Sequence, residues 1–294
     1  MTGQRNRCRA DAASFELLDQ VRADGNGKDI DPGYGSEPFR TLAAETPDSS
    51  VYPGKDFRIE WGPVFHRGRL DGSAKVLLVG QDPAQHETIL RRILVGEAGH
   101  RIQGFLAKLG IDRSYVMVNT YLYSVYGQGG GTRHKDDKKI AAYRNRWLKA
   151  LLDSNQIEAV VALGTLADHA WNVFRASPDG ANLSVKYEPI THPTAPESAG
   201  GTAAQHAAAI ARMLQNWNGA LQSLHPLQHP DKSGPLRLYG TSFKPGEKVE
   251  IPEADVPPWA PDWMRLNDGW ADRPGTGRTK RASILVKVPT SFLP

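Results

Sequence analysis

Three polar side chains follow predicted strands, two of which are short apolar runs of the kind that form buried strands. Asp82 comes after VLLVG, Asn119 ends the run YVMVN, and His192 follows residues 185–190. A carboxylate and an imidazole can exchange protons or stabilise charge, and a carboxamide can both donate and accept hydrogen bonds. In an open α/β sheet, ligands bind beyond the carboxyl ends of the parallel strands. The sequence therefore predicts one site built from these three side chains.

The turn that carries Asp82 has a restricted geometry. Gly80 permits backbone conformations that other residues resist, and Pro83 keeps Asp82 out of the α region. Taken singly, an Asp-Pro pair, a His-Pro pair or an asparagine after a strand is more typical of an ordinary turn or cap. Their joint occurrence at three strand ends favours the functional interpretation.

The periodicity of apolar residues predicts the elements that would position these groups. Short apolar runs predict strands, and stretches with a repeat of three to four residues predict helices between them. This alternation is typical of an α/β protein, here a three-layer α/β/α fold with a central four-stranded parallel sheet. The expected strands are residues 75–80, 115–118, 159–163 and 185–190, and the expected helices are residues 88–95, 99–109, 138–152, 164–174 and 202–224.

Composition divides the chain into three parts. Residues 1–50 form an N-terminal extension with one short helical pattern around residues 15–21, and residues 51–224 form the α/β/α domain. Residues 225–294 hold 11 of the 21 prolines together with three tryptophans, so we expect an extended C-terminal segment packed on the core. Within the domain, residues 53–72 alternate aromatic and basic side chains, which indicates an edge hairpin or a cover for the sheet.

Charge and cysteine content exclude several classes of protein. Lys and Arg number 36 against 32 Asp and Glu, a mild excess that is compatible with a polyanionic partner. Cys8 is the only cysteine, which excludes disulfide frameworks, Cys-rich zinc modules and a four-cysteine iron–sulfur cluster within this chain. No apolar run approaches the roughly 18 residues of a spanning helix, and no signal peptide opens the chain. We expect a cytoplasmic protein, nucleoid-associated if its source is bacterial.

Four short motifs, in order, resemble the uracil-DNA glycosylase superfamily. GQDPAQHE is similar to its first motif, GQDPYH in the classical branch, and HPTAPES is similar to its second, HPS followed by a DNA-probing loop. Between them, VGEAGHRIQGFLAKLGIDRSYVMVNT resembles the middle region of the iron–sulfur branch, and VVALGTLA resembles the strand and helix start that follow in both branches. The resemblance covers about residues 75 to 215.

The resemblance implies a role for each motif residue. Asp82 would act on the glycosidic bond, Gln81 would help to bind uracil through its backbone, Asn119 would read the base, and His192 would contact the leaving group. It also implies a four-stranded parallel sheet between helices and a hydrolysis that needs no cofactor and no metal. With one cysteine, the chain would be a cluster-free relative of the iron–sulfur branch.

Three positions depart from the family pattern. Ala84 stands where the classical motif has a tyrosine that occupies the space of a thymine methyl group, a gap that Gln85, His86 or Leu94 would have to fill. Leu94 aligns with the phenylalanine on which the family stacks uracil. In the second-motif loop, which the resemblance implies contacts DNA, Pro196 stands where the classical branch has its leucine wedge. That loop is Pro193, Thr194, Ala195 and Pro196.

A glycine-rich segment, residues 124–137, is expected to form a basic loop at the same end of the sheet. Its Arg133 and His134 are either phosphate contacts or members of a solvated loop, and the two interpretations are about equally favoured. The three consecutive glycines are no phosphate loop, because no Gly-Lys-Ser/Thr follows them.

The function that the resemblance implies is a monofunctional DNA glycosylase. It would flip out and excise uracil from single- or double-stranded DNA, leaving an abasic site, and would work as a monomer. Two alternatives stay open. The same fold could act on another damaged or mismatched base, or the protein could hold uracil-containing or abasic DNA with slow turnover.

Overall fold

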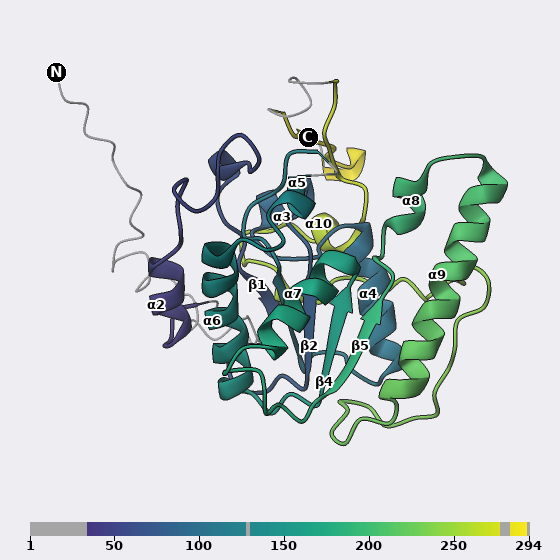
Figure 1. Ribbon diagram of the computed structural model, residues 1–294. Coiled ribbons are helices and arrows are strands. Elements are labelled where there is room, and N and C mark those ends of the chain that lie inside the picture. The colour runs from purple at the N-terminus through teal and green to yellow at the C-terminus, as the bar shows by residue number, and fades with distance from the viewer. Residues whose placement is uncertain (1–33, 128–129, 277–282, 293–294) are drawn as a thin grey trace.

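The computed structural model describes residues 34–127, 130–276 and 283–292. At its centre lies a five-stranded sheet of order β1-β3-β2-β4-β5 (Figure 1). Four strands run parallel, and the edge strand β1 pairs antiparallel with β3. The strands are β1 (His66–Gly68), β2 (Val76–Gly80), β3 (Tyr115–Asn119), β4 (Ala159–Leu163) and β5 (Lys186–Ile190).

The four predicted parallel strands are confirmed, but the sheet has five strands, one more than predicted. The additional strand β1 lies in the stretch that was expected to form an edge hairpin or a cover. It has only three residues, all of them buried, so it shows no alternation of apolar and polar side chains that a sequence pattern could reveal. Gly68 is required here, because its φ is +95° and a Cβ would lie 2.2 Å from the Tyr115 carbonyl oxygen.

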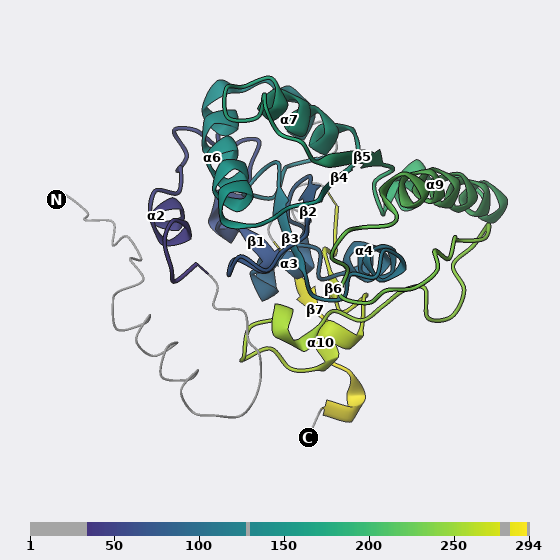
Figure 2. The same cartoon turned by 90° about the horizontal axis from the view of Figure 1, so that it is seen from below.

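Helices cover both faces of the sheet, as the predicted three-layer fold requires (Figure 2). On one face α6 and α7 share a core cluster with strand residues such as Leu77 and Val160, and α2 packs on α6. On the other face α4 and α9 share a cluster with Leu78 and Val161. These helices are α2 (Phe39–Ala44), α4 (Glu97–Lys108), α6 (Lys138–Ser154), α7 (Thr165–Arg175) and α9 (Ala203–Leu224). The predicted cap of the last helix is confirmed, since Thr202 and Gln205 form a reciprocal capping box.

The helix expected at residues 88–95 is wrong in both bounds. Helix α3 (Gln85–Leu90) begins directly after Ala84 and ends where Arg91 takes a φ of +56°. Leu94 also has a positive φ, +54°, so residues 91–95 form an irregular connection to α4. The remaining short elements are α5 (Gly130–Arg133), α8 (Ala195–Ala199), α10 (Trp263–Leu266), the 3-10 turns η1 (Ile59–Trp61), η2 (Glu253–Asp255) and η3 (Thr290–Phe292), and the hairpin strands β6 (Ala271–Asp272) and β7 (Leu285–Val286).

The C-terminal segment packs on the core through its own apolar cluster, in which Trp263 and Trp270 meet Leu90 and Val95. Asp255 anchors this segment to the edge of the sheet, because its fully buried carboxylate bonds Arg67, Arg69 and the hydroxyl of Tyr115. Removing one partner of such a buried pair costs about 3 to 5 kcal/mol.

Two features predicted near the chain ends stay untested. The helix expected around residues 15–21 lies outside the described residues, and the domain boundaries at residues 50 and 224 remain predictions. Within the described residues, no helix has the length and apolar character needed to cross a membrane.

Candidate active site

The structure places the three predicted side chains at or just after the carboxyl ends of parallel strands, at one end of the sheet. Asn119 ends β3 and pairs in register with Gly80, two residues before Asp82. His192 follows β5, whose neighbour β4 ends at Leu163 in register with Ile190. This end is the upper one in Figure 1, where α3, α5 and α8 also lie. The three candidate residues therefore all lie at the carboxyl ends of the parallel strands, and their action as one site stays a prediction.

Both carboxylate oxygens of Asp82 accept hydrogen bonds. The backbone N–H of Val125 donates to Oδ2 at 3.0 Å, and the side-chain amide of Gln81 donates to Oδ1 at 3.1 Å. Burial raises the pKa of Asp82, while these two bonds and the nearby positive charges of Arg273 and Arg58 oppose the rise. The surrounding groups thus stabilise the ionised form of a carboxylate in a desolvated place.

Asn119 is only 7% exposed, and its amide lies against the backbone of Gly80. A Cβ at position 80 would come within 2.2 Å of Asn119 Oδ1. Gly80 itself has no positive φ, so the expectation that it serves a special turn is wrong. Glycine is needed there because the base-reading candidate occupies the space of a side chain.

The connection from β3 holds the backbone of the first motif in place. Thr120 donates to the Gly80 carbonyl from both its N–H and its hydroxyl, each at 2.9 Å. Tyr121 N–H donates to the Gln81 carbonyl at 2.9 Å. Since Gln81 and Gly80 precede Asp82 directly, these bonds fix the direction from which its carboxylate enters the site.

His192 is oriented by its own loop. Its Nδ1 accepts a hydrogen bond from the backbone N–H of Thr194 at 3.3 Å and lies 3.2 Å from the Thr194 hydroxyl. Burial lowers the pKa of His192 to about 4, so the ring is neutral at pH 7. With Nδ1 acting as acceptor, the proton of the neutral ring is on Nε2, which makes His192 a hydrogen-bond donor. Gly164, whose Cβ would lie 3.1 Å from that of His192, leaves room for the ring.

The second-motif loop is held by a residue that sequence reasoning missed. Arg101, a buried arginine of α4, donates to the Pro193 carbonyl and to both carboxylate oxygens of Glu197, at 3.0 and 2.7 Å. Pro193 and Pro196 are buried in this state, whereas Thr194 and Ala195 are partly exposed. The repeat of apolar residues that identified the helix gives no sign of Arg101, which occupies one of its core-facing positions.

The side chains that flank Ala84 turn away toward the C-terminal segment. Gln85 donates to the Ala271 carbonyl at 3.3 Å, and the Ala271 N–H donates to His86 Nε2 at 3.1 Å. The ring of His86 also packs edge-on against Trp270, with 4.8 Å between the ring centres. Neither Gln85 nor His86 therefore occupies the position beside Asp82 that the classical motif fills with tyrosine.

Leu94 is buried in an unusual backbone conformation. Its carbonyl lies so close to α4 that a Cβ at Gly99 would be 1.6 Å from the oxygen. Non-glycine residues with positive φ cost about 1 to 3 kcal/mol and are enriched at functional sites. The structure thus locates Leu94 in a constrained turn, and its predicted contact with the base stays a prediction.

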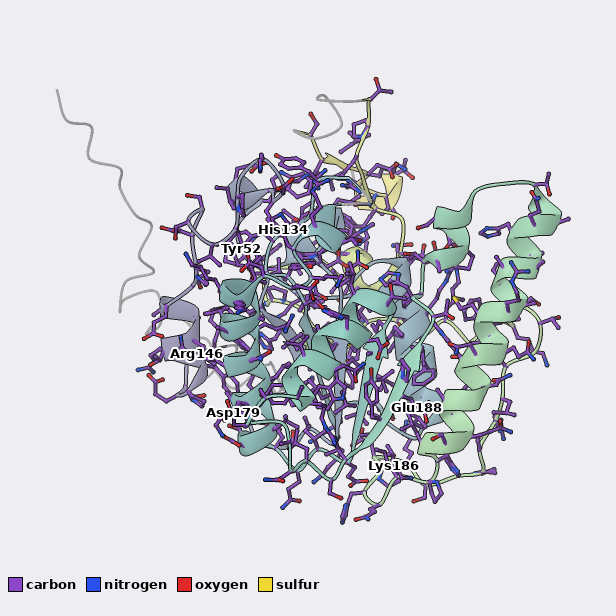
Figure 3. All side chains as sticks on the ribbon, in the orientation of Figure 1. Tyr52, His134, Arg146, Asp179, Lys186 and Glu188 are labelled. Carbon is purple, nitrogen blue, oxygen red and sulfur yellow. The ribbon has the colours of Figure 1, made fainter. Side chains whose placement is uncertain are left out.

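Arg133 and His134 both bind Asp56. Arg133 Nη2 lies 2.6 Å from Asp56 Oδ1, and His134 Nε2 lies 3.0 Å from Oδ2. The His134 side chain is 14% exposed and packs on the ring of Phe57, whereas that of Arg133 is 59% exposed. Figure 3 shows His134 toward the upper end of the molecule, far from Lys186 at the start of β5. Of the two, Arg133 is the one whose charge faces solvent.

Arg58 supports the segment that binds Asp82, and the sequence offered no specific signal for it. Its guanidinium donates to the Val125 carbonyl at 2.5 Å and to the Ser124 hydroxyl at 3.0 Å. It lies over the rings of Trp61 and Tyr126, at 4.7 and 4.4 Å. Because the N–H of Val125 donates to Asp82, Arg58 is a positioning residue for the carboxylate.

No group of three or more His, Cys, Asp or Glu side chains among the described residues is arranged to hold a metal ion. The arrangement of a bonded carboxylate, a buried amide and a neutral imidazole can instead bind a polar heterocycle and assist the departure of an anion.

The fold and the site define an α/β enzyme that acts on a ligand bound beyond the ends of its parallel strands. The family model of the uracil DNA glycosylase superfamily matches residues 67–233, more than half of the chain, and the chain belongs to this superfamily. It is accordingly a DNA glycosylase, a hydrolase of N-glycosyl bonds. The comparison with curated proteins gives no match.

Proposed function

We propose that this protein excises uracil from DNA by hydrolysing the N-glycosidic bond of deoxyuridine. The observation that carries the proposal is the amide of Asn119, almost fully buried at the strand ends beside the residues of the first motif. An amide offers an N–H to uracil O4 and a carbonyl to uracil N3–H, whereas cytosine presents the opposite pattern. A site left with unpaired buried polar groups rejects an analogue by roughly 10⁴-fold or more.

The chemistry assigns one task to each of the two titratable groups. As the bond between C1′ and the base nitrogen breaks, the sugar becomes cationic and uracil becomes anionic. Asp82 stabilises the cation and orients the water whose oxygen bonds to C1′. His192 donates from Nε2 to the developing uracil oxyanion, and one such donor is worth about 3 to 4 kcal/mol. A proton of the water ends on uracil, so the products are free uracil and an abasic site.

The direct test measures uracil release from single-stranded and duplex oligonucleotides that contain one deoxyuridine. Release with multiple turnover is the expected result, and product counts that stop at one per protein molecule would instead favour a DNA-binding role. Intact oligonucleotides, under conditions where a known glycosylase cleaves them, would overturn the proposal. We further propose that the protein works as a monomer and, because its substrate is DNA, that it acts in the cytoplasm, nucleoid-associated if the source is bacterial.

A second candidate substrate is another damaged or mismatched base. The observation in its favour is that Gln85 and His86 bind the C-terminal segment, which leaves Ala84 without a bulky neighbour from α3. A methyl group is discriminated by shape for only about 1 to 3 kcal/mol. Oligonucleotides with uracil, thymine, hypoxanthine or xanthine, offered at equal concentration, decide between the two substrates by the base released.

Replacing the base reader should change the base that is read. Asn119→Asp removes the amide donor that faces uracil O4 and supplies an acceptor for the amino group of cytosine. We expect cytosine release from this variant and a fall in uracil release of at least about 10²-fold. The measurement is chromatography of the free bases, and a folded variant that releases no cytosine would contradict the role of Asn119.

A further inference from the structure

The C-terminal segment reaches the candidate active site through its short hairpin. Strand β6 binds α3 by two hydrogen bonds, from Ala271 N–H to His86 and from Gln85 to the Ala271 carbonyl, at 3.1 and 3.3 Å. Helix α3 begins three residues after Asp82. The residue that follows β6, Arg273, is therefore delivered to the neighbourhood of the catalytic carboxylate by a segment more than 180 residues away in sequence.

Strand pairing, an ion pair and a buried tryptophan fix the position of this hairpin. Ala271 and Asp272 pair with Val286 and Leu285 of β7, and the carboxylate of Asp272 binds Lys287 at 2.5 Å. The preceding Trp270 is buried and donates from its indole N–H to the Met264 carbonyl at 2.7 Å. Arg273 thus extends from a well-packed support.

The guanidinium of Arg273 has no hydrogen bond or ion pair with any residue that the structure describes. It is nevertheless partly buried, and its charge lies close enough to Asp82 and Arg58 to lower the pKa of both groups. Both oxygens of Asp82 accept from Val125 and Gln81, and Arg58 donates to Val125 and Ser124. Arg273 is consequently a cation beside the site, and its charged neighbours Asp82 and Arg58 already have other partners.

We propose that Arg273 binds a phosphodiester group of the DNA strand beside the nucleotide extruded into the site. The inference rests on the proposed function only in taking DNA as the ligand, whichever base is removed. A planar guanidinium binds phosphate oxygens with two parallel hydrogen bonds, and the partial burial of the charge strengthens that interaction. The C-terminal segment is thereby part of the DNA-binding surface as well as a cover for the sheet.

The test compares the wild type with Arg273→Gln in binding a duplex that carries a stable abasic-site analogue, which requires no cleavage. We expect the variant to bind about tenfold more weakly, and the slope of log Kd against log salt to fall by about one unit. The two phosphates flanking the analogue are then replaced, one at a time, by uncharged methylphosphonates. At the phosphate that Arg273 binds, the replacement should abolish the difference in affinity between wild type and variant.

The matched control is Arg237→Gln, which removes the same charge from an exposed position of the same segment, near Lys108 and Gly110 at the far end of α4. This variant should bind like the wild type. Equal binding by Arg273→Gln and wild type, with only the acidic limb of a pH–rate profile displaced, would overturn the proposal and leave Arg273 as an electrostatic neighbour of Asp82. Weaker binding without any uracil release would refute the proposed substrate and leave the phosphate contact standing.

Discussion

The two sides of the candidate site are held in different ways. One is the β2 edge, residues 80–87, which follows β2 and carries Asp82. Segments from elsewhere in the chain hold it, namely the connection after β3 through Thr120 and Tyr121, the loop at Val125, and the C-terminal hairpin at Ala271. In each of these contacts the other segment donates a backbone N–H, so the β2 edge is tied to the backbone of the surrounding core.

The other side is the β5 edge, residues 191–199, which carries His192. The imidazole is oriented by Thr194 within the same loop, and the loop is held by side chains of two helices. Arg101 of α4 bonds Pro193 and Glu197, while Asn216 and Trp217 of α9 bond the backbone of Thr191 at 2.7 and 2.9 Å. Gly200 and Gly201, both with positive φ, connect this edge to α9. A loop that is held by side chains and ends in two glycines can change position when DNA binds more readily than the β2 edge.

Burial acts on both sides but has opposite consequences for charge. It raises the pKa of Asp82 and lowers that of His192, favouring the neutral form in each case. At Asp82 two hydrogen bonds and the cations Arg273 and Arg58 oppose the effect of burial on the pKa, whereas at His192 only Glu197 opposes it. The difference suits the proposed chemistry, in which an ionised carboxylate meets a cation and a neutral imidazole donates to an anion.

The largest effect should come from the rigid edge. Asp82→Asn keeps the size of the side chain but removes the charge, so we expect kcat for base release to fall by about 10³-fold. Binding to abasic-analogue DNA should change little, because the amide still accepts from Val125. Single-turnover kinetics beside a binding titration separate the two quantities. A variant that retained a tenth of the activity would show that Asp82 is not the catalytic carboxylate.

A smaller effect is expected at the β5 edge. His192→Ala removes one donor to the leaving group, which corresponds to about 10²- to 10³-fold in kcat. Because the pKa of His192 is lowered to about 4, the wild-type ring stays neutral from pH 8 down to about pH 5 and protonates only below that range. The wild-type rate should therefore show no inflection near pH 6.5, where an ordinary histidine titrates.

Protonation of His192 leaves its Nε2–H donor in place, so the acidic limb of that pH profile should report the protonation of Asp82. Its pKa is raised, so activity should decline at a pH above the ordinary value of 3.8 as the carboxylate protonates. His192→Ala should lower the plateau and leave this limb in place. An inflection near pH 6.5 that disappears in His192→Ala would show instead that the imidazole titrates as an exposed group does.

The contrast between the edges also explains what the sequence could predict. The four parallel strands and the residues at their ends follow from local runs and short motifs, since strand ends of a parallel sheet meet whatever the loops do. Arg101, Arg58 and Arg273 could not be found in this way, because each acts on a segment distant in sequence. An edge hairpin or a cover was expected over residues 53–72, but the three buried residues of β1 are too few to mark the strand itself. The role of Gly80 was misjudged because the neighbour that needs its space lies on another strand.

The predicted DNA contacts show the same limit. Arg133 and His134 are adjacent and basic, which made them equal candidates, yet Asp56 and Phe57 bury the second and leave the first facing solvent. The partner of a surface charge depends on which loop the fold brings beside it. A sequence pattern gives the charge but not that neighbour.

The smallest effect should come from loosening the anchor of the β5 edge. Arg101→Met removes the bonds to the Pro193 carbonyl and to Glu197 while keeping much of the apolar volume of the side chain on α4. Because His192 keeps its Thr194 partner, we expect kcat on single-stranded DNA to fall by no more than about threefold. KM for duplex DNA should rise by about tenfold, since the mobile loop must be ordered each time it meets the helix.

The control for this prediction is Lys248→Met. Lys248 binds Glu97 at 2.9 Å, and Arg101 binds the same carboxylate. In the described part of the chain Lys248 forms no hydrogen bond or ion pair with the β5 edge. This variant should leave both kinetic constants unchanged and so separate loss of the anchor from loss of charge near α4. If Arg101→Met lowered kcat on single-stranded DNA as strongly as His192→Ala, the β5 edge would need the same rigidity as the β2 edge, and the distinction between them would fail.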